Sequence, residues 1–430
     1  MTAVVILAIL LALLLLGVPI AFALGGLGLV MLAYADISLV MVPQGLLSGV
    51  DNFVLLAVPL FLLMSTVLLK GGVGQDLFAA VQSWVGHWPG GLAVATVISC
   101  ALFSAISGSS VATAATIAVV AVPEMLRRGY PPPFVYGLIA AGGTLGILIP
   151  PSIPLIVYGV VTEESIPSLF LAGVVPGLML AGGFILFALL YGRFSKRFAP
   201  IAKADWAERR RTTLRALPTL FIAGTIFAGI YSGAFTPTES AGVGLALAVV
   251  VVMALRWVDG QPPISLKLYW EAAEEATRTT VTILLIVVCA KIFGKAVTLY
   301  LIPQSVAEAI ALHVTDAGVF ILVVSVVLLI LGFFLEALSM LLIVVPVLFP
   351  SLRAMGIDPI WFGIYFMILI ECALITPPVG LNLFVLQAVA KAKLGDVVRG
   401  VWPFIAIMLG MVVLLTLFPG LALFLPFGVF

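Results

Sequence analysis

The sequence has few charged residues and very little histidine or cysteine. Charged side chains make up 9% of the 430 residues and the formal net charge is +1, whereas soluble domains carry about 25% charged residues. A near-neutral chain offers no basic surface, so we expect no nucleic-acid partner. The few cysteines and histidines show no disulfide or metal-ligand spacing; they are Cys100, Cys289, Cys372, His87 and His313.

The sequence also lacks a Gly-x-x-x-x-Gly-Lys-Ser/Thr loop, the motif that holds nucleotide phosphates. Both histidines fall in polar connectors, and no nucleophile and base are paired in the sequence. We therefore expect neither ATP hydrolysis nor an enzyme. Transport by such a chain would need an ion gradient.

Hydrophobic residues, in contrast, make up 63% of the chain, and the mean hydropathy is +1.31. This composition predicts an all-α polytopic membrane protein, because apolar runs of about 20 residues can cross a bilayer as helices. The first run lacks a basic start and a cleavage site, so we expect it to be retained as a helix. The predicted spans are 3–34 (broken near Pro19), 53–70, 133–165, 169–192, 216–232, 236–257, 279–298, 359–390 and 402–425.

Five helix-breaking residues recur once at a constant offset of 227 residues. They are Pro123, Gly129, Pro132, Pro150 and Pro151, matched by Pro350, Gly356, Pro359, Pro377 and Pro378. A Pro-Pro pair inside an apolar segment is tolerated only where the broken helix lies against protein or a wet cavity. Paired interruptions of this kind indicate a duplicated unit with a transport site.

The duplication divides the chain into a first repeat at 1–192, a basic loop at 193–215 and a second repeat at 216–430. In the first repeat we predict a re-entrant hairpin at 91–128 and a broken helix at 133–165. The second repeat places its hairpin at 317–352 and its broken helix at 359–390. Two ordinary spans with a short polar loop are the alternative for each hairpin.

Lys and Arg residues orient the chain, because cytoplasmic loops are enriched in them. The 193–215 loop is strongly basic and is therefore assigned to the cytoplasm. Counting membrane crossings from this loop puts Lys70 and Arg127 inside and Glu163 outside. The ends of the second hairpin then lie outside, so the two repeats have opposite topology. This order places the N-terminus in the cytoplasm and the C-terminus in the periplasm.

Three polar stretches between the spans, 72–87, 260–278 and 300–313, are predicted to be interfacial helical arms, with plain loops as the alternative.

Several motifs resemble the large membrane subunit of a tripartite ATP-independent periplasmic (TRAP) transporter, a bacterial inner-membrane protein. The resemblance implies a sodium-coupled elevator carrier with transport and scaffold domains. It also implies a small four-helix membrane subunit and a periplasmic substrate-binding protein as partners. The motifs are Ser107-Gly-Ser-Ser-Val-Ala-Thr, Gly146-Ile-Leu-Ile-Pro-Pro-Ser, Thr236-Pro-Thr-Glu-Ser-Ala and Thr376-Pro-Pro-Val-Gly-Leu-Asn.

Sodium, a hard cation, prefers oxygen ligands, and carbonyls at a helix break have lost their intrahelical donors. We therefore predict one cation site in each repeat. The first would use Ser107, Ser110, Gly146, Ile149 and Pro151; the second would use Gly332, Ala373, Thr376 and Pro378.

The substrate is expected between the two hairpin tips, where half-helix N-termini and hydroxyls attract a carboxylate. The predicted substrate residues are Ser107, Ser109, Ser152, Glu336 and Asn382. Backbone capping is the alternative role for the serines, and a buried structural role is the alternative for Glu336.

Two further acids, Glu371 and Glu239, lie in or beside apolar segments. Glu371 occupies the position of Thr144 in the first repeat, where a structural hydrogen bond is preferred over a proton site. Glu239 follows a helix start, where a carboxylate caps free N–H groups. No cluster of arginines is expected at the site, so sialic acid, a C4-dicarboxylate or another small organic acid all fit. A self-sufficient ion-coupled anion carrier or antiporter of a related fold is the alternative function.

Overall fold

The computed structural model describes residues 2–35, 42–43, 47, 51–195, 201–260, 266–305, 316–333, 335–377 and 380–428. In this part of the chain the protein is all helical, and nine helices are long and apolar enough to cross a membrane. The all-α polytopic class predicted from composition is confirmed.

The first half of the chain begins with two short helices and contains the first hairpin and the first broken helix. Its elements are α1 (Thr2–Leu15), α2 (Ile20–Tyr34), the 3-10 turn η1 (Phe53–Leu56), α4 (Ala57–Lys70), α5 (Val73–Val85), α6 (Gly91–Ser107), α7 (Ser110–Arg127), α8 (Pro132–Leu148), α9 (Ile153–Thr162) and α10 (Ile166–Ser195).

The second half contains three long helices, followed by the second hairpin and the second broken helix. Its elements are α11 (Trp206–Tyr231), α12 (Pro237–Val258), α13 (Leu266–Leu299), α15 (Ala317–Leu331), α16 (Ala337–Ala354), α17 (Pro359–Ile375), α18 (Leu381–Ala390), α19 (Leu394–Leu417) and α20 (Gly420–Phe427).

The helix bounds reproduce the duplication. Helices α16 and α17 begin and end 227 residues after α7 and α8, and Gly129 and Gly356 end corresponding helices with positive φ. From α18 onward the offset is 228, because the second break has one more residue than the first. The two hairpins, α6–α7 and α15–α16, and the two broken helices, α8–α9 and α17–α18, lie at the predicted places.

Proline and capping residues set where the paired helices start. Helix α8 begins at Pro132 and α17 at Pro359, where a missing N–H costs nothing because the first helical N–H groups have no intrahelical partner. Asp358 caps α17: its Oδ1 accepts from the N–H of Ile360 at 2.8 Å and of Trp361 at 2.9 Å.

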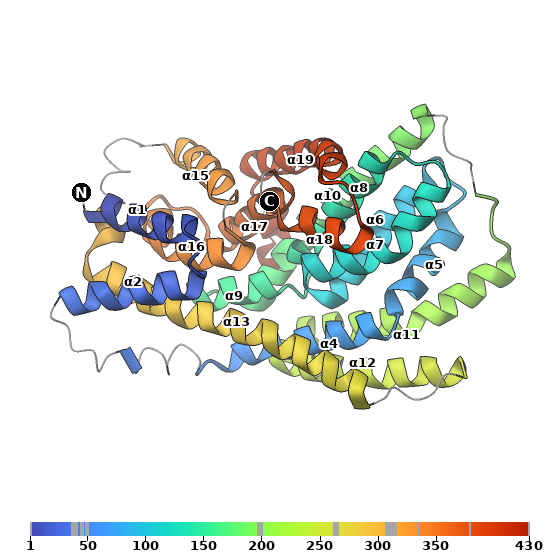
Figure 1. Ribbon diagram of the computed structural model, residues 1–430, viewed down its shortest axis with the longest axis horizontal. Helices are drawn as coiled ribbons and strands as arrows, with labels where there is room; N and C mark the ends of the chain where they lie inside the picture. The colour runs from blue at the N-terminus through green and yellow to red at the C-terminus, as the bar shows by residue number, and fades with distance from the viewer. Residues whose placement is uncertain are drawn as a thin grey trace.

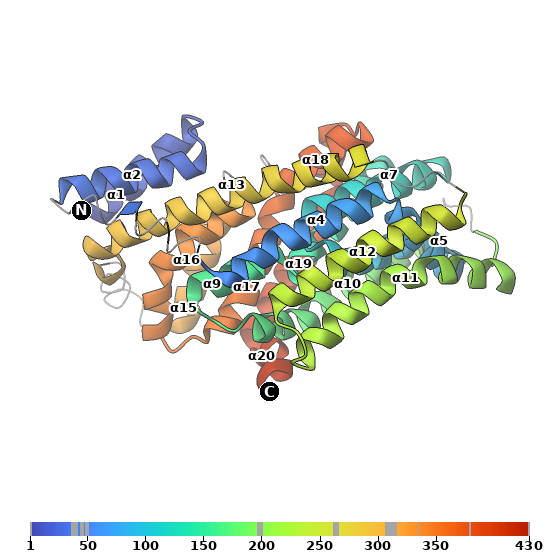
Figure 2. The same ribbon diagram turned by 90° about the horizontal axis from the view of Figure 1, so that it is seen from below.

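The long helices form two layers. The outer layer runs in the order α2, α13, α4, α12 and α11, with each helix packed on the next. Figure 2 shows α13, α4, α12 and α11 side by side. The hairpin bundle, made of α6 to α10 and α15 to α19, covers one side of this layer (Figure 1).

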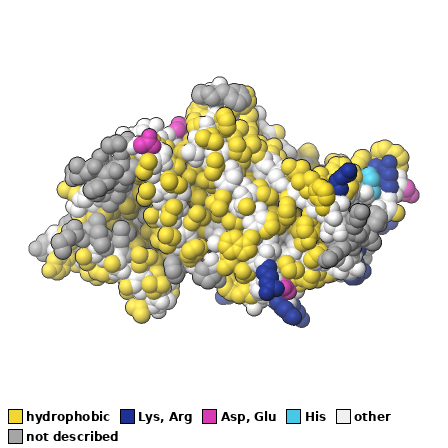
Figure 3. Space-filling model, turned by 90° about the horizontal axis from the view of Figure 1, so that it is seen from above, with side chains coloured by type: hydrophobic (Ala, Val, Ile, Leu, Met, Phe, Trp, Pro, Cys, Tyr) yellow, Lys and Arg dark blue, Asp and Glu magenta, His cyan; other side chains and the backbone are white. Residues whose placement is uncertain are grey.

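The molecular surface matches a membrane environment. Figure 3 shows a mainly hydrophobic face, with Lys and Arg side chains gathered at one end and along one edge. Trp206, Trp257 and Trp270 are more than 70% exposed at the ends of α11, α12 and α13, as is typical of aromatic residues at a membrane interface.

Ion pairs between helices join ends that the sequence assigned to the same side. Arg215 lies 2.6 Å from Asp76 and 2.5 Å from Asp259, all at predicted cytoplasmic ends. Arg353 and Glu164, both predicted to be periplasmic, lie 3.7 Å apart. This pairing agrees with opposite topology in the two repeats.

Some segments differ from the expectation. The stretch 266–278 is not a separate arm, because it continues into the 279–298 span as the single helix α13. Helices α10 and α11 extend into the 193–215 loop. The last predicted span, 402–425, begins earlier, at Leu394, and is divided into α19 and α20. The arm at 72–87 is present as α5, whereas most of the arm at 300–313 lies outside the described residues.

The first predicted span is also different. The chain breaks near Pro19, but α2 then runs back alongside α1 (Figure 1), with Gly17 at φ 81° in the turn. Glycine adopts this left-handed conformation without a steric cost. The prediction of a cytoplasmic N-terminus assumes that residues 3–34 cross the membrane once. Because α2 runs back alongside α1, these residues do not form one continuous crossing.

Candidate functional site

A cavity of about 540 Å³ lies between the outer layer and the hairpin bundle. This volume lies within the range of small-molecule sites. Both hairpin tips and both helix breaks reach its wall from one side, and α4 and α13 form the opposite wall. The cavity therefore lies where the sequence predicted the substrate.

Ser109 and Glu336 begin the second helices of the two hairpins, at equivalent positions, and both line the cavity. The Ser109 hydroxyl accepts from the N–H of Ala112 at 3.4 Å and so caps α7. Glu336 does not cap α16; its Oε1 accepts from the Ser339 hydroxyl at 3.1 Å. One tip thus presents a hydroxyl and the other a carboxylate.

Two of the predicted substrate serines lie behind the wall. Ser107 is fully buried, and its hydroxyl lies 2.9 Å from that of Thr113 within the same hairpin. Ser152 is also fully buried, and it caps α9 by accepting from the N–H of Leu155 while donating to the Ile147 carbonyl. Both side chains hold the shape of the first hairpin and break rather than lining the cavity.

Asn382 links the second break to the first hairpin. This fully buried side chain donates from Nδ2 to the Ser110 hydroxyl at 2.7 Å and to the Ala140 carbonyl at 3.1 Å. Within the described residues, its Oδ1 has no hydrogen-bond partner. An unpaired buried amide oxygen is a potential ligand for a cation.

The first break leaves carbonyl oxygens without their helical donors. Pro150 and Pro151 have no N–H, so the carbonyls of Gly146 and Ile147 lose their i+4 partners. Ser152 donates to the Ile147 carbonyl in place of the missing donor, whereas the Gly146 carbonyl has no N–H at position i+4 to accept from. The break therefore supplies the kind of oxygen that the sequence predicted for a cation.

The first hairpin tip packs directly on this break. A Cβ on Gly108 would lie 2.6 Å from the Pro151 carbonyl oxygen, and one on Gly146 would lie 2.8 Å from that of Ser109. Only glycine permits this close approach. The predicted cation residues Ser107, Ser110, Gly146, Ile149 and Pro151 thus belong to one tip-and-break junction.

The second repeat has an equivalent junction. Gly332, at the end of α15, packs on Ala373 so closely that a Cβ would overlap its side chain. The Thr376 hydroxyl donates to the Cys372 carbonyl at 2.5 Å. Pro377 removes the usual donor of the Ala373 carbonyl, which accepts instead from the Thr376 N–H at 3.2 Å. Pro378 lies outside the described residues.

The two remaining acids occupy different environments. Glu239 forms a capping box with Thr236, which is the helix-capping role predicted for it from the sequence. Glu371 is fully buried beside Thr144, and neither of its oxygens has a well-formed hydrogen bond to the described residues. It does not line the cavity.

The sequence did not single out the outer wall of the cavity. This wall carries hydroxyl and charged side chains from two neighbouring helices, among them Ser65, Thr66, Glu275, Arg278 and Thr279. The available signal was Ser65-Thr66 inside the apolar 53–70 span, together with the polar stretch that opens α13. Neither signal indicates by itself that the two helices are neighbours.

Comparison with known proteins identifies the family to which the chain belongs. Residues 7–421 match the family model described as "Tripartite ATP-independent periplasmic transporter, DctM component". The chain belongs to this family. A C4-dicarboxylate TRAP transporter large permease protein DctM from Pseudomonas aeruginosa is 40% identical over 381 residues, which cover 87% of each chain.

Other DctM relatives have different named substrates. The sialic acid TRAP transporter large permease protein SiaM of Vibrio cholerae is 34% identical, with 97% of this chain and 96% of SiaM aligned.

The crystal structure of the Alcanivorax borkumensis YdaH transporter matches with a TM-score of 0.64 at 16% identity, covering 95% of this chain and 98% of that one. That likeness shows a shared fold. The DctM relatives are transporter permeases rather than enzymes.

Proposed function

We propose that this DctM-family chain imports a small organic acid with sodium, by an elevator motion of the hairpin bundle against the outer layer. The observation that carries the proposal is the cavity between these two layers, which both hairpin tips and both helix breaks reach. A site at such an interface can face either side of the membrane when one layer moves past the other.

Sodium would be held at the two tip-and-break junctions. The first offers the hydroxyls of Ser107 and Ser110 and the carbonyls of Gly146, Ile149 and Pro151. The second offers the carbonyls of Gly332 and Ala373 with the Thr376 hydroxyl; the predicted ligand Pro378 lies outside the described residues. Carbonyl oxygens that lose their helical N–H donor at a break fit this hard cation. Asn382, which contacts Ser110, adds an amide oxygen that has no partner among the described residues.

The place of the cavity along α4 and α13 supports one state of the transporter. Its outer wall is the C-terminal half of α4 and the N-terminal half of α13. These halves end near Lys70, which the positive-inside rule assigns to the cytoplasm. The proposal therefore assigns the structure to a cytoplasm-facing state.

The family relationship supports two partners, a small four-helix membrane subunit and a periplasmic binding protein that delivers the substrate. The relatives named for C4-dicarboxylates and sialic acid support an organic acid as the substrate. The proposed location is the bacterial inner membrane.

Uptake into proteoliposomes tests the proposal. With both partners present, an inward sodium gradient is expected to drive accumulation of an organic acid such as succinate or sialic acid, and choline in place of sodium is expected to abolish it. Thr376→Ala should raise the sodium concentration needed for half-maximal uptake, because a cation ligand is lost.

Two outcomes would change the assignment. Full uptake in sodium-free buffer at fixed pH would reject sodium coupling. Equal uptake without the two partners would favour the self-sufficient anion carrier instead.

A further inference from the structure

A separate pocket of about 230 Å³ lies at the end of the molecule that the sequence assigns to the cytoplasm. Its wall combines the 86–91 turn between α5 and α6 with Arg128 and Tyr130 after α7 and Gly192 near the end of α10. Among the described residues, it shares none with the cavity between the two layers. Its volume is below the roughly 300–1,000 Å³ of sites that enclose a whole small molecule. We propose that this pocket binds a phosphate group, carried either by a phospholipid headgroup or by a free phosphate ester.

The pocket presents positive charge and hydrogen-bond donors. Arg128 lines it, and the described lining residues include no carboxylate. His87 also lines it, and the Nδ1 atom of His87 is buried without a hydrogen-bond partner among the described residues. A guanidinium can donate two parallel N–H groups to a phosphate, and an imidazole can donate a further one. The pocket therefore suits a phosphate group.

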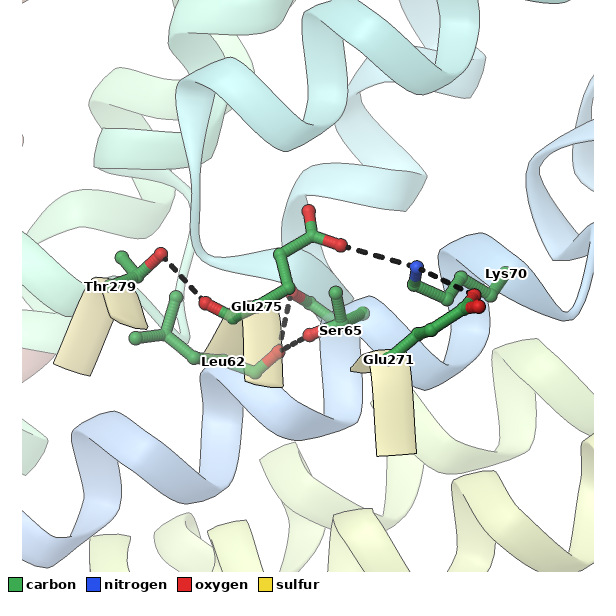
Figure 4. A network of polar contacts seen from close by, with 7 residues as sticks. Leu62, Ser65, Lys70, Glu271, Glu275 and Thr279 are labelled. Atoms are coloured by element: carbon green, nitrogen blue, oxygen red, sulfur yellow. Dashed lines mark hydrogen bonds and ion pairs between the residues drawn. The ribbon is translucent and has the colours of Figure 1, made fainter. Parts of the chain in front are cut away.

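Two other cations at this end of the molecule are already paired with carboxylates. The Lys70 ammonium lies 3.4 Å from Glu275 and 4.0 Å from Glu271, so it bridges two successive turns of α13 (Figure 4). Arg215 likewise lies between two carboxylates. Neither cation needs a further anion to balance its charge.

Arg128, in contrast, shares its carboxylate with a second arginine. Glu124 Oε1 accepts from Arg128 Nε at 2.7 Å, and Glu124 Oε2 accepts from Arg127. Two guanidinium groups and one carboxylate leave a net charge of +1 at this cluster. Because the bond from Arg128 uses Nε, it leaves the terminal Nη groups of Arg128 for a ligand in the pocket.

The pocket also lies where the two layers of the molecule are joined. Helix α5 is fastened to α11 of the outer layer: the hydroxyls of Ser83 and Thr212 lie 3.0 Å apart, and Trp84 Nε1 donates to the Thr213 hydroxyl at 2.9 Å. The 86–91 turn then leads from α5 into α6 of the hairpin bundle. A phosphate group in the pocket would contact the turn and the bundle at once.

Exposed tryptophans place the pocket at the level of lipid headgroups. Trp84 and Trp88 are each 42% exposed, and Trp88 lines the pocket. Tryptophan is enriched at membrane–water interfaces, and the cytoplasmic leaflet carries anionic lipids that attract basic residues near its surface. A phospholipid headgroup can therefore reach Arg128 from the membrane, and a dissolved phosphate ester can reach it from the cytoplasm.

Two probes test the proposal and distinguish the two sources. Dioctanoyl phosphatidylglycerol carries its phosphate on a lipid, and glycerol 3-phosphate carries it free. The purified full chain is titrated with each probe, and native mass spectrometry counts the bound molecules. We expect at least one probe to bind, and Arg128→Gln to weaken that binding about tenfold, because a charged hydrogen-bond donor is lost. Binding of the lipid alone assigns the site to a headgroup, whereas binding of glycerol 3-phosphate assigns it to a free ester.

Arg127→Gln is the matched control. It removes the same charge from the same carboxylate, but the Arg127 side chain is 75% exposed and does not line the pocket. Binding should therefore change by less than about twofold, as expected for an exposed charge. Dioctanoylglycerol has the same acyl chains without a phosphate, so its binding should not differ between Arg128→Gln and the wild type.

A second variant keeps the test decisive if Arg128→Gln does not fold. His87→Phe keeps an aromatic ring at the turn and removes the ring nitrogens, so it should also weaken phosphate binding. The proposal is overturned if neither probe binds the wild-type chain, or if Arg127→Gln weakens binding as much as Arg128→Gln does. Unchanged binding in folded Arg128→Gln, or in His87→Phe where Arg128→Gln fails to fold, overturns it as well.

Discussion

At the scale of single residues, Asn382 is the side chain that ties the two repeats together at the site. It begins the helix after the second break, yet its hydrogen bonds go to Ser110 and Ala140 of the first repeat. The first hairpin tip and the second broken helix are therefore expected to move as one body.

A double-mutant cycle checks this bond. Asn382→Ala should lower the free energy of unfolding by about 1–3 kcal/mol, because two buried acceptors lose their donor. Ser110→Ala should cost less, and the double variant should cost less than the sum of the two. Thermal unfolding in detergent measures all three. Strict additivity would show that the bond contributes nothing.

The sequence located the hairpin tips better than it predicted the contacts of the residues at them. It placed Ser109 and Glu336 at hairpin tips, because small or polar residues interrupt an apolar run there. It could not separate Ser109 from Ser107 two residues away, since only the left-handed turn at Gly108 directs Ser107 inward, toward Thr113.

At the scale of helices, α8 and α19 pack closely against each other. Gly137 and Gly400 face each other, and a Cβ on either would overlap backbone atoms of the other helix. Small residues allow helix backbones to approach in this way, which is a common means of association in membranes.

Substitution at this crossing has a matched control on the same helix. Gly400→Ala should destabilise the protein by about 1–3 kcal/mol, because backbone atoms of α8 cannot yield as a side chain can. Gly410→Ala should be neutral or slightly stabilising, since nothing lies within 4 Å of its Cβ position and alanine is the better helix former. Equal melting temperatures for the two variants would contradict the close approach.

Helix ends were predictable wherever proline or a capping residue marks them. Pro132, Pro359 and the Thr236–Glu239 box all fall at starts that the structure confirms. The sequence predicted a span that starts at 279, whereas α13 starts at Leu266. Polar residues such as Glu274 and Glu275 end the apolar run without ending the helix. Carboxylates one turn from a basic residue are compatible with a helix that emerges from the membrane.

At the scale of the whole molecule, the charged helix ends divide into two groups. Lys70, Asp76 and Arg215 belong to the group predicted to be cytoplasmic, while Glu164 and Arg353 belong to the periplasmic group. The sequence predicted this division from basic loops. It could not predict that α4 and α13 are neighbours, because that contact joins residues about 200 positions apart and leaves no local pattern.

Accessibility labelling checks the division. A cysteine replacing Arg210 should react only from the cytoplasm, and one replacing Arg353 only from the periplasm. The three native cysteines are buried, so a low background is expected. Labelling of both sites from the same face would reject the opposite topology of the repeats.

The crossing of α8 and α19 also has a consequence for biosynthesis. Helix α8 is made well before its partner α19, because the whole of the second repeat up to Lys393 lies between them in the chain. The glycine-containing face of α8 therefore lacks its partner until α19 has been made. The two repeats have corresponding helices, yet neither can reach its final packing without the other.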